Sequence, residues 1–202
     1  MEAVFLSITT DSCGAVILAG GLSRRMGRCK ATLPLGGQSM LLRTRAQLTD
    51  FDSVLLSCND AQLSCGFEAV PDRMPGCGPL AGIHAALSAT EKEALFTVPC
   101  DLPNFSRELP ALLMDELDEE TDVLICRDGE GNLHPLCGIY RRRILPQLEQ
   151  CLQEGQFRVM NFVHRVHWKC IDTGGRLPDR IFFNMNTPED YRAAAAQSDA
   201  PE

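Results

Sequence analysis

The sequence predicts one α/β domain of three layers, in which helices cover both faces of a doubly wound, mostly parallel sheet with one antiparallel strand. Three observations predict it. Short, uniformly apolar runs indicate strands buried on both faces. Stretches with apolar residues at helical spacing alternate with these runs, and Gly- and Pro-rich loops separate them. The chain has 202 residues, of which 45% are hydrophobic and 23% charged, so it is long enough to bury one sizeable core.

The first half of the chain begins this alternation. Residues 15–18 form an apolar run that ends at Gly20 and Gly21, which is typical of a buried parallel strand followed by a backbone turn. The segment 71–79 is predicted to be a loop, because three of its nine residues are Pro and two are Gly. In chain order, the other expected elements are a helix over 40–48, strands over 54–56 and 68–70, a helix over 80–89 and a strand over 94–98.

The second half repeats the pattern with one reversal. Residues 133–140 predict an antiparallel strand, because the chain returns through a turn at 128–132 rather than through a helix. The remaining expected elements are a helix over 107–117, a strand over 122–126, helices over 144–152 and 157–164, a strand over 166–171 and a helix over 188–197 that has Pro188 in its first turn.

The composition and the N-terminal residues indicate a cytoplasmic protein. The first ten residues lack the basic flank of a secretory signal, and no apolar stretch reaches the ~18 to 20 residues of a membrane span. The ten cysteines are scattered singly without metal-ligand spacing, so we expect reduced thiols. We expect an N-terminal extension over 1–13, whose apolar run at 4–8 suits an edge strand or an interaction tail, one domain over 14–197 and a tail over 198–202.

Charge is distributed unevenly along the chain. The net charge is −8, yet residues 12–49 contain six Lys or Arg and no Asp or Glu. An acidic chain disfavours indiscriminate binding to nucleic acid, whereas one basic segment without acidic residues favours a compact anion as ligand. A basic surface patch without a binding role is the alternative on charge alone.

The basic segment contains a glycine-rich loop. Residues 18–30 read Leu-Ala-Gly-Gly-Leu-Ser-Arg-Arg-Met-Gly-Arg-Cys-Lys. Gly20 and Gly21 allow a sharp turn that presents backbone N–H groups to phosphate oxygens, and Arg25 and Lys30 add charge-assisted donors. The loop differs from the P-loop and from the dinucleotide-binding fingerprint in the spacing of its glycines. It therefore predicts a phosphate cradle of another kind.

The spacing Leu-Ala-Gly-Gly-x-Ser-x-Arg-Met-Gly-x-x-Lys resembles the signature loop of nucleotidyltransferases, in particular the MobA-like molybdenum cofactor guanylyltransferases. Further matches extend the resemblance from about Gly14 to Tyr191. It implies the fold of the nucleotide-diphospho-sugar transferases and the transfer of GMP from Mg²⁺-bound GTP to molybdopterin or its molybdenum form, with release of pyrophosphate. It also implies a recipient molybdoenzyme or its chaperone, and neither nucleic acid nor a membrane as partner.

The resemblance implies roles for particular residues. Arg25 and Lys30 would bind the triphosphate and act in catalysis together with Asp101, the implied Mg²⁺ ligand. Asp72, ahead of the Gly-Pro-Leu-Ala-Gly segment at 78–82, would accept hydrogen bonds from N1 and the exocyclic amine of guanine. Asn184 and Asn186 are implied at the acceptor. The full set of implied nucleotide-binding residues is Leu18, Ala19, Gly20, Gly21, Lys30, Asn59, Asp72, Gly82 and Asp101.

Simpler structural interpretations remain open from the residues alone. Asn59 and Asp72 also suit turns, Asp101 suits a cap, and Thr187 followed by Pro188 is a plain helix start. Two other functions also fit the chain, namely a cytidylyltransferase of the same fold and a non-catalytic module that binds and delivers a nucleotide or pterin.

Overall fold

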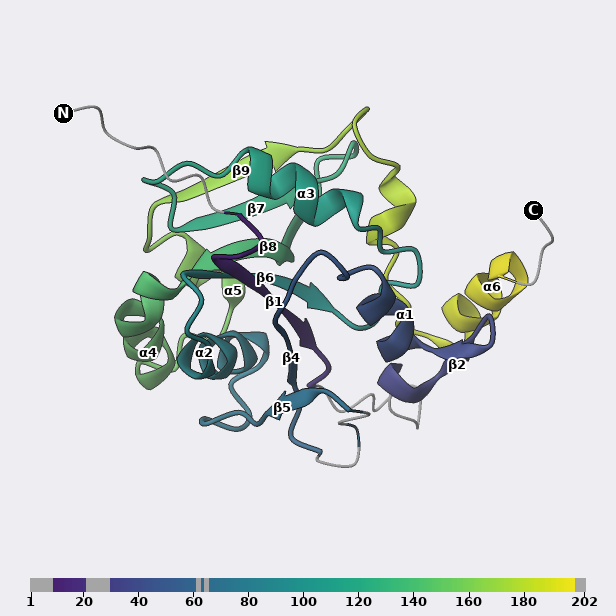
Figure 1. Cartoon of the computed structure of the whole chain (residues 1–202), viewed down its shortest axis with the longest axis horizontal. Helices are drawn as coiled ribbons and strands as arrows, with labels where there is room; N and C mark the ends of the chain where they lie inside the picture. Colours follow the sequence, from purple (N-terminus) through teal and green to yellow (C-terminus); the bar gives the residue numbers. More distant parts are fainter. Residues whose placement is uncertain (1–8, 21–29, 61–62, 64–65, 199–202) are drawn as a thin grey trace.

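The computed structural model describes residues 9–20, 30–60, 63 and 66–198, and for the side chains it ends at 196. Its centre is a sheet of seven strands in the order β5-β4-β1-β6-β8-β7-β9 (Figure 1). The strands are β1 (Cys13–Leu18), β4 (Val54–Ser57), β5 (Glu68–Val70), β6 (Ala94–Pro99), β7 (Val123–Arg127), β8 (Leu133–Arg141) and β9 (Trp168–Asp172).

Neighbouring strands run parallel except where β8 takes part. The pairs β5–β4, β4–β1, β1–β6 and β7–β9 are parallel, and β8 is antiparallel to both β6 and β7. This confirms the predicted sheet. β1 begins at Cys13, two residues before the expected start, and the apolar run at 4–8 lies outside the described residues.

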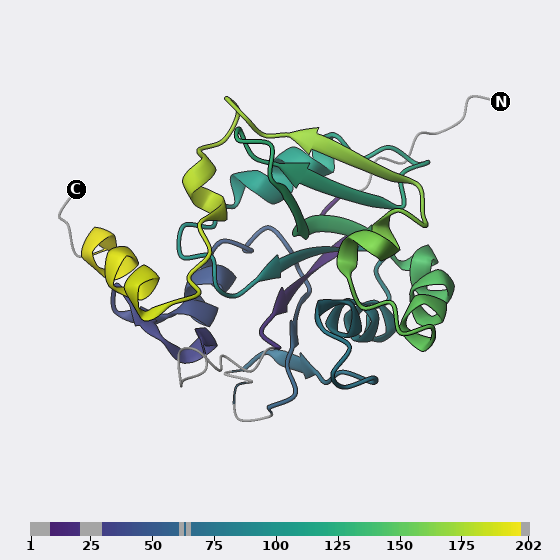
Figure 2. The ribbon, with the colours of Figure 1, turned by 180° about the vertical axis from the view of Figure 1, so that it is seen from behind.

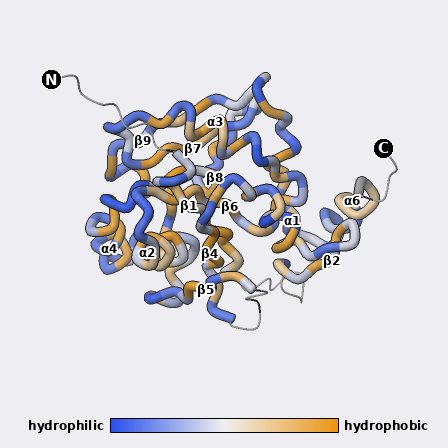
Figure 3. The backbone as a smooth tube through the Cα atoms, in the orientation of Figure 1, coloured by the Kyte–Doolittle hydropathy of each residue, from blue (hydrophilic) through white to orange (hydrophobic). Residues whose placement is uncertain are grey.

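Helices cover both faces of the sheet, as expected for a doubly wound fold (Figure 2). On β1, Ala15 and Ile17 belong to one apolar cluster and Val16 and Leu18 to the other, so alternate side chains enter opposite layers. Hydrophobic residues follow the central strands β1, β4 and β6 in Figure 3. The α-helices are α1 (Met40–Ala46), α2 (Pro79–Ala89), α3 (Glu108–Asp115), α4 (Leu145–Gln153), α5 (Val159–Val163) and α6 (Pro188–Ser198). None of the described helices has the length and apolar character needed to cross a membrane.

A small third cluster joins the C-terminal helix to a hairpin that the sequence analysis did not predict. The hairpin consists of β2 (Pro34–Leu35) and β3 (Gln38–Ser39), and α6 lies beside it in Figure 1. The Tyr191 hydroxyl donates a hydrogen bond to the Pro34 carbonyl at 2.7 Å. The buried members of this cluster are Leu33, Leu35, Met40, Met185 and Ala194.

The hairpin had a sequence signal that its short strands obscured. Gly36 and Gly37, at its turn, have φ angles of 57° and 82°. Two consecutive positive φ angles are what a tight hairpin turn of two residues requires, and Gly-Gly supplies them without strain. Strands of two residues are too short to show alternation. Short 3-10 turns at η1 (Lys30–Thr32), η3 (Arg142–Ile144) and η4 (Asp179–Phe182) were likewise not predicted.

Candidate functional site

A pocket of about 270 Å³ opens where β1, β4 and β6 end. From β1 the chain continues to β4 and β5 on one side of β1 and then returns to β6 on its other side. Such a reversal of strand order is where open α/β sheets bind ligands. Of the residues that the family resemblance implies at the nucleotide, Leu18, Asp72 and Asp101 lie at or just after strand ends and line the pocket, whereas Asn59 is not part of its lining. The lining residues are Leu18, Ala19, Gly20, Lys30, Ala31, Ser57, Asp72, Gly78, Pro79, Gly82, Pro99, Cys100, Asp101 and Leu136.

Lys30 connects three distant segments at one side of the pocket. Its Nζ donates to Asp101 Oδ2 at 2.9 Å and to Asn186 Oδ1 at 2.7 Å. The Lys30 and Asp101 side chains are each only 16% exposed, so the ammonium and the carboxylate compensate each other in a partly desolvated place. Three predicted site residues thereby come together, namely Lys30 in η1, Asp101 after the end of β6 and Asn186 before α6.

The segment that contains Asn184 and Asn186 is fixed to the strand end by its backbone. The N–H of Met185, which is fully buried, donates to the Asp101 carbonyl at 2.9 Å. Asp190 Oδ2 accepts from the N–H groups of Asn186 and Thr187, both at 2.8 Å. These backbone bonds lower the pKa of Asp190.

Thr187 starts α6, as the simpler interpretation proposed. The N–H of Asp190 donates to Thr187 Oγ1 at 3.1 Å, while the Asp190 carboxylate accepts from the Thr187 N–H. This reciprocal pair is a capping box. Asn184 is exposed at the surface.

Asp101 has one carboxylate oxygen available for a cation. Oδ2 is bonded to Lys30, whereas Oδ1 is buried and has no hydrogen-bond partner among the described residues. A buried acceptor without a donor is costly, and a hard divalent cation is a partner that a carboxylate oxygen suits. The residues present therefore fit a magnesium ion.

Asn59 supports Asp72 from outside the pocket wall. Asp72 N–H donates to Asn59 Oδ1 at 2.8 Å, and Asn59 Nδ2 donates to Asp72 Oδ2 at 2.9 Å. The pair ties the chain after β4 to the chain after β5 and orients the Asp72 carboxylate, which lines the pocket. Both ends of the Asn59 amide are engaged in this way.

Gly82 lets α2 pack very closely against the sheet. A Cβ at this position would lie 2.3 Å from Ser57 Oγ and 3.4 Å from Leu18 Cδ2. The contact holds the first turn of α2, with Gly78 and Pro79, against the ends of β4 and β1. Gly82 therefore sets the width of the pocket as well as lining it.

Two of the predicted site residues, Gly21 and Arg25, lie in residues 21–29, outside the described part of the chain.

Sequence reasoning missed a buried carboxylate in the turn after β7. Asp128 Oδ1 accepts from the N–H groups of Glu130 and Asn132, and Oδ2 accepts from Asn132 Nδ2 and from His134 Nε2 at 2.9 Å. Burial alone would raise the pKa of Asp128, but the bonds from Asn132 and His134 outweigh it and hold that pKa well below its usual range. The Asp-Gly-x-Gly-Asn sequence indicated a turn but not its buried acceptor.

Comparisons with known proteins agree on one family. The chain matches the family model described as "MobA-like NTP transferase domain" over residues 15–167. It is 38% identical over 198 residues to a molybdenum cofactor guanylyltransferase of Rhizobium meliloti, covering 90% of each chain. It is 34% identical over 190 residues to one of Shewanella frigidimarina, covering 91% of this chain and 95% of the relative.

Solved structures of low sequence identity share the fold. Molybdopterin-guanine dinucleotide biosynthesis protein A from Archaeoglobus fulgidus superposes with a TM-score of 0.78 at 23% identity, covering 91% of this chain and 97% of that one. A CMP:2-keto-3-deoxy-manno-octonic acid synthetase complexed with CTP gives a TM-score of 0.72 at 15% identity, covering 92% and 98%.

Gly82→Ala should narrow the pocket and lower nucleotide affinity, because the added methyl group overlaps Ser57 Oγ. Overpacking of this kind costs about 1–3 kcal/mol. Ser57→Ala in the same chain removes the overlapping atom and should restore most of the loss, measured by calorimetric titration of nucleotide. Ser57→Ala alone is the control. A double variant as weak as Gly82→Ala would contradict the packing explanation.

Asp128→Asn should reduce the protein's loss of stability at acid pH. In the wild type, the unfolded chain takes up a proton near the ordinary Asp pKa of 3.8 while folded Asp128 does not, so stability falls as the pH falls through that value. The stability difference between wild type and variant should therefore be largest near pH 7 and shrink below pH ~4. Urea denaturation across this range measures it, with Glu130→Gln as the control for losing one charge in the same turn. A difference that is constant with pH would contradict it.

Proposed function

Since the chain belongs to the MobA-like NTP transferase family, we propose that it transfers GMP from GTP to the terminal phosphate of molybdopterin or of its molybdenum form, releasing pyrophosphate. The observation that carries this proposal is the pocket that places the Lys30–Asp101–Asn186 network beside the Asp72 carboxylate. The product would pass to a molybdoenzyme or to its chaperone.

The chemistry of the acceptor explains why the pocket needs no general base. A phosphate monoester has a second pKa of about 6, so its attacking oxygen is already ionised near neutral pH. That oxygen attacks the α-phosphorus of GTP, a new P–O bond forms, and the bond to pyrophosphate breaks as pyrophosphate leaves. Catalysis then depends on alignment and on neutralising negative charge.

Lys30 is suited to that neutralisation. Its ammonium has three N–H donors, and the described residues Asp101 and Asn186 accept from two of them, which leaves the third for a phosphate oxygen as far as the described residues go. The backbone at Leu18, Ala19 and Gly20 lines the pocket beside it and would approach the phosphates. From the sequence, we assign Gly21 and Arg25 to the same task.

Asp101 would hold Mg²⁺ through Oδ1, the oxygen to which no described residue donates a hydrogen bond. When bound, magnesium neutralises phosphate charge and takes its remaining ligands from phosphate and water. Asn184 and Asn186 would face the acceptor. Asn186 already contacts Lys30, so the acceptor end and the triphosphate end of the site meet at one ammonium group.

Asp72 would select guanine. An ionised carboxylate accepts from N1–H and from the exocyclic amine of guanine, and adenine and cytosine lack this pair of donors. Asn59 fixes the orientation of Asp72 through two hydrogen bonds. The first turn of α2, with Gly78 and Gly82, would lie along the base.

Pyrophosphate release in the presence of Mg²⁺ and molybdopterin tests the function directly. We expect release with GTP and at most about 1% of that rate with CTP or ATP, because mismatched donors leave Asp72 unpaired. Asp101→Asn should lower kcat by roughly a hundredfold or more while GTP still binds. Preference for CTP would replace the guanine assignment by cytidylyl transfer, and GTP binding without turnover in the wild type would favour a delivery module.

Asp72→Asn should lower kcat/KM for GTP by roughly ten- to a hundredfold, since a hydrogen bond to a charged group contributes about 1.5–3 kcal/mol. Inosine triphosphate lacks the exocyclic amine, so the ratio of kcat/KM for GTP to kcat/KM for inosine triphosphate should fall in the variant. Glu68→Gln removes the same charge at the other end of β5, where it is exposed, and is the matched control. An unchanged ratio in Asp72→Asn would rule out this role.

A further inference from the structure

His134, at the start of β8, lies between a buried carboxylate and an aromatic ring. Its Nε2 is 2.9 Å from Asp128 Oδ2, and its ring stacks on Phe182 with centroids 4.0 Å apart and planes 9° from parallel. A carboxylate that stays ionised only accepts hydrogen bonds, so Nε2 carries the hydrogen. The hydrogen bond fixes the plane of the imidazole, and the stacked Phe182 ring follows that plane.

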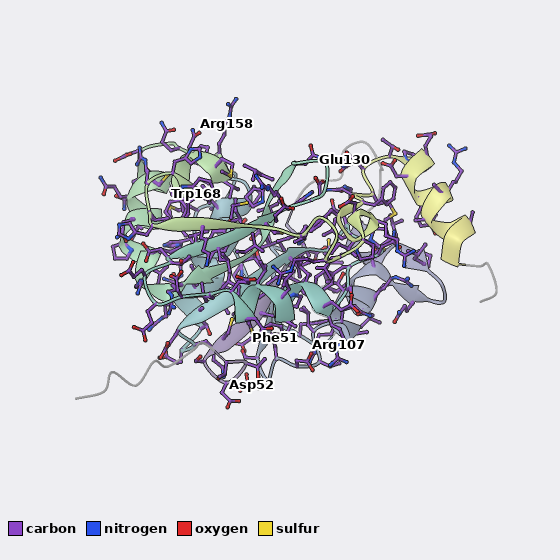
Figure 4. All side chains as sticks on the ribbon, turned by 90° about the horizontal axis from the view of Figure 1, so that it is seen from above. Phe51, Asp52, Arg107, Glu130, Arg158 and Trp168 are labelled. Carbon is purple, nitrogen blue, oxygen red and sulfur yellow. The ribbon has the colours of Figure 1, made fainter. Side chains whose placement is uncertain are left out.

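A second contact joins the same turn to the other end of η4. The Gly129 N–H donates to Asp179 Oδ1 at 2.8 Å. A Cβ on Gly129 would lie 3.0 Å from Asp179 Oδ2, so the turn approaches η4 closely. Asp179 is the first residue of η4 and Phe182 the last. Glu130, labelled in Figure 4, marks the tip of this turn.

η4 leads directly into the 184–186 segment, which is hydrogen-bonded to two residues of the pocket lining. Met185, three residues after Phe182, donates its N–H to the Asp101 carbonyl, and Asn186 accepts from Lys30 at 2.7 Å. Three residues span roughly 10 Å at most, so the place of the Phe182 ring restricts where Met185 and Asn186 can lie.

We propose that Asp128 and His134 are positioning residues that act through Phe182 to hold the 184–186 segment against Asp101 and Lys30. Neither Asp128 nor His134 is among the residues that line the pocket. Its effect on catalysis rests on the proposed function, whereas its effect on the 184–186 backbone does not.

A plain packing role predicts different results from a positioning role. An apolar side chain at 134 would also cover Phe182, but it would not fix the ring plane, because it could not donate a hydrogen bond to Asp128 as the imidazole does. His134→Phe keeps a stacking ring and loses the hydrogen bond, and His134→Ala loses both. Comparing the two separates the hydrogen bond from the stacking contact.

Hydrogen exchange and kinetics test the proposal together. In His134→Ala, we expect the Met185 amide to exchange at least about tenfold faster. The KM for molybdopterin should rise on the order of ten- to a hundredfold, with the KM for GTP within about twofold. His134→Phe and Asp128→Asn should show intermediate effects in both measurements. Calorimetric stoichiometry of GTP binding corrects each rate for the folded fraction.

The matched control is His164, which contacts Trp168 with ring centroids 5.4 Å apart. Trp168 pairs with Val123 at the start of β7, whereas Asp128 follows the end of that strand, and Figure 4 shows Trp168 far from Glu130. His164→Ala should leave Met185 exchange unchanged. Equal acceleration in both variants would indicate general loosening and overturn the proposal.

Two other outcomes separate the proposals. Unchanged Met185 exchange in His134→Ala, His134→Phe and Asp128→Asn would overturn the positioning role, even if GMP transfer is observed. Absence of GMP transfer by the wild-type protein would overturn the proposed function, and the exchange measurements would still decide whether Asp128 and His134 hold the segment.

Discussion

The site depends on the Lys30 ammonium group, which donates hydrogen bonds to two described side chains. Lys30 Nζ is shared by Asp101 and Asn186, which lie 71 and 156 positions further along the chain. Because Lys30 and Asp101 are each mostly buried, neither charge is stable there without the other. The interaction therefore requires that η1, the end of β6 and the segment before α6 meet within hydrogen-bond distance, and much of the architecture serves that requirement.

Two parts of the fold meet this requirement. The parallel pairing of β1 with β4 and β6 brings their carboxyl ends to one edge, which fixes Asp101 relative to Ala19 and Gly20 after β1. The third apolar cluster then anchors the other two segments. Leu35 of the hairpin and Met185 are both buried in it, so the hairpin after η1 and the residues before α6 share one small core. Packing remote from the pocket thereby sets the position of Lys30 and Asn186.

The sequence predicted the sheet, its antiparallel strand and the six α-helices, because buried strands and amphipathic helices leave periodic signals. It did not predict contacts that depend on tertiary structure. Asn59 was assigned to the nucleotide, and its two hydrogen bonds to Asp72 were not predicted. Asp128 and His134 are only six positions apart, but the Phe182 ring that stacks on His134 and the Asp179 carboxylate that accepts from Gly129 belong to η4, about fifty residues later in the chain. No local pattern encodes such a contact.

The polar groups of the unbound site are already arranged to complement the ligands proposed for it. Within the described part of the chain, Lys30 has one N–H donor left after its two bonds, and Asp101 has one acceptor left, Oδ1, after its bond to Lys30. A phosphate oxygen complements the first and a divalent cation the second, and the two ligands also bind each other. The ion pair keeps both groups in place before either ligand arrives, so little reorganisation is needed when they bind. A donor and an acceptor held side by side in this way favour a metal–triphosphate complex over either component alone.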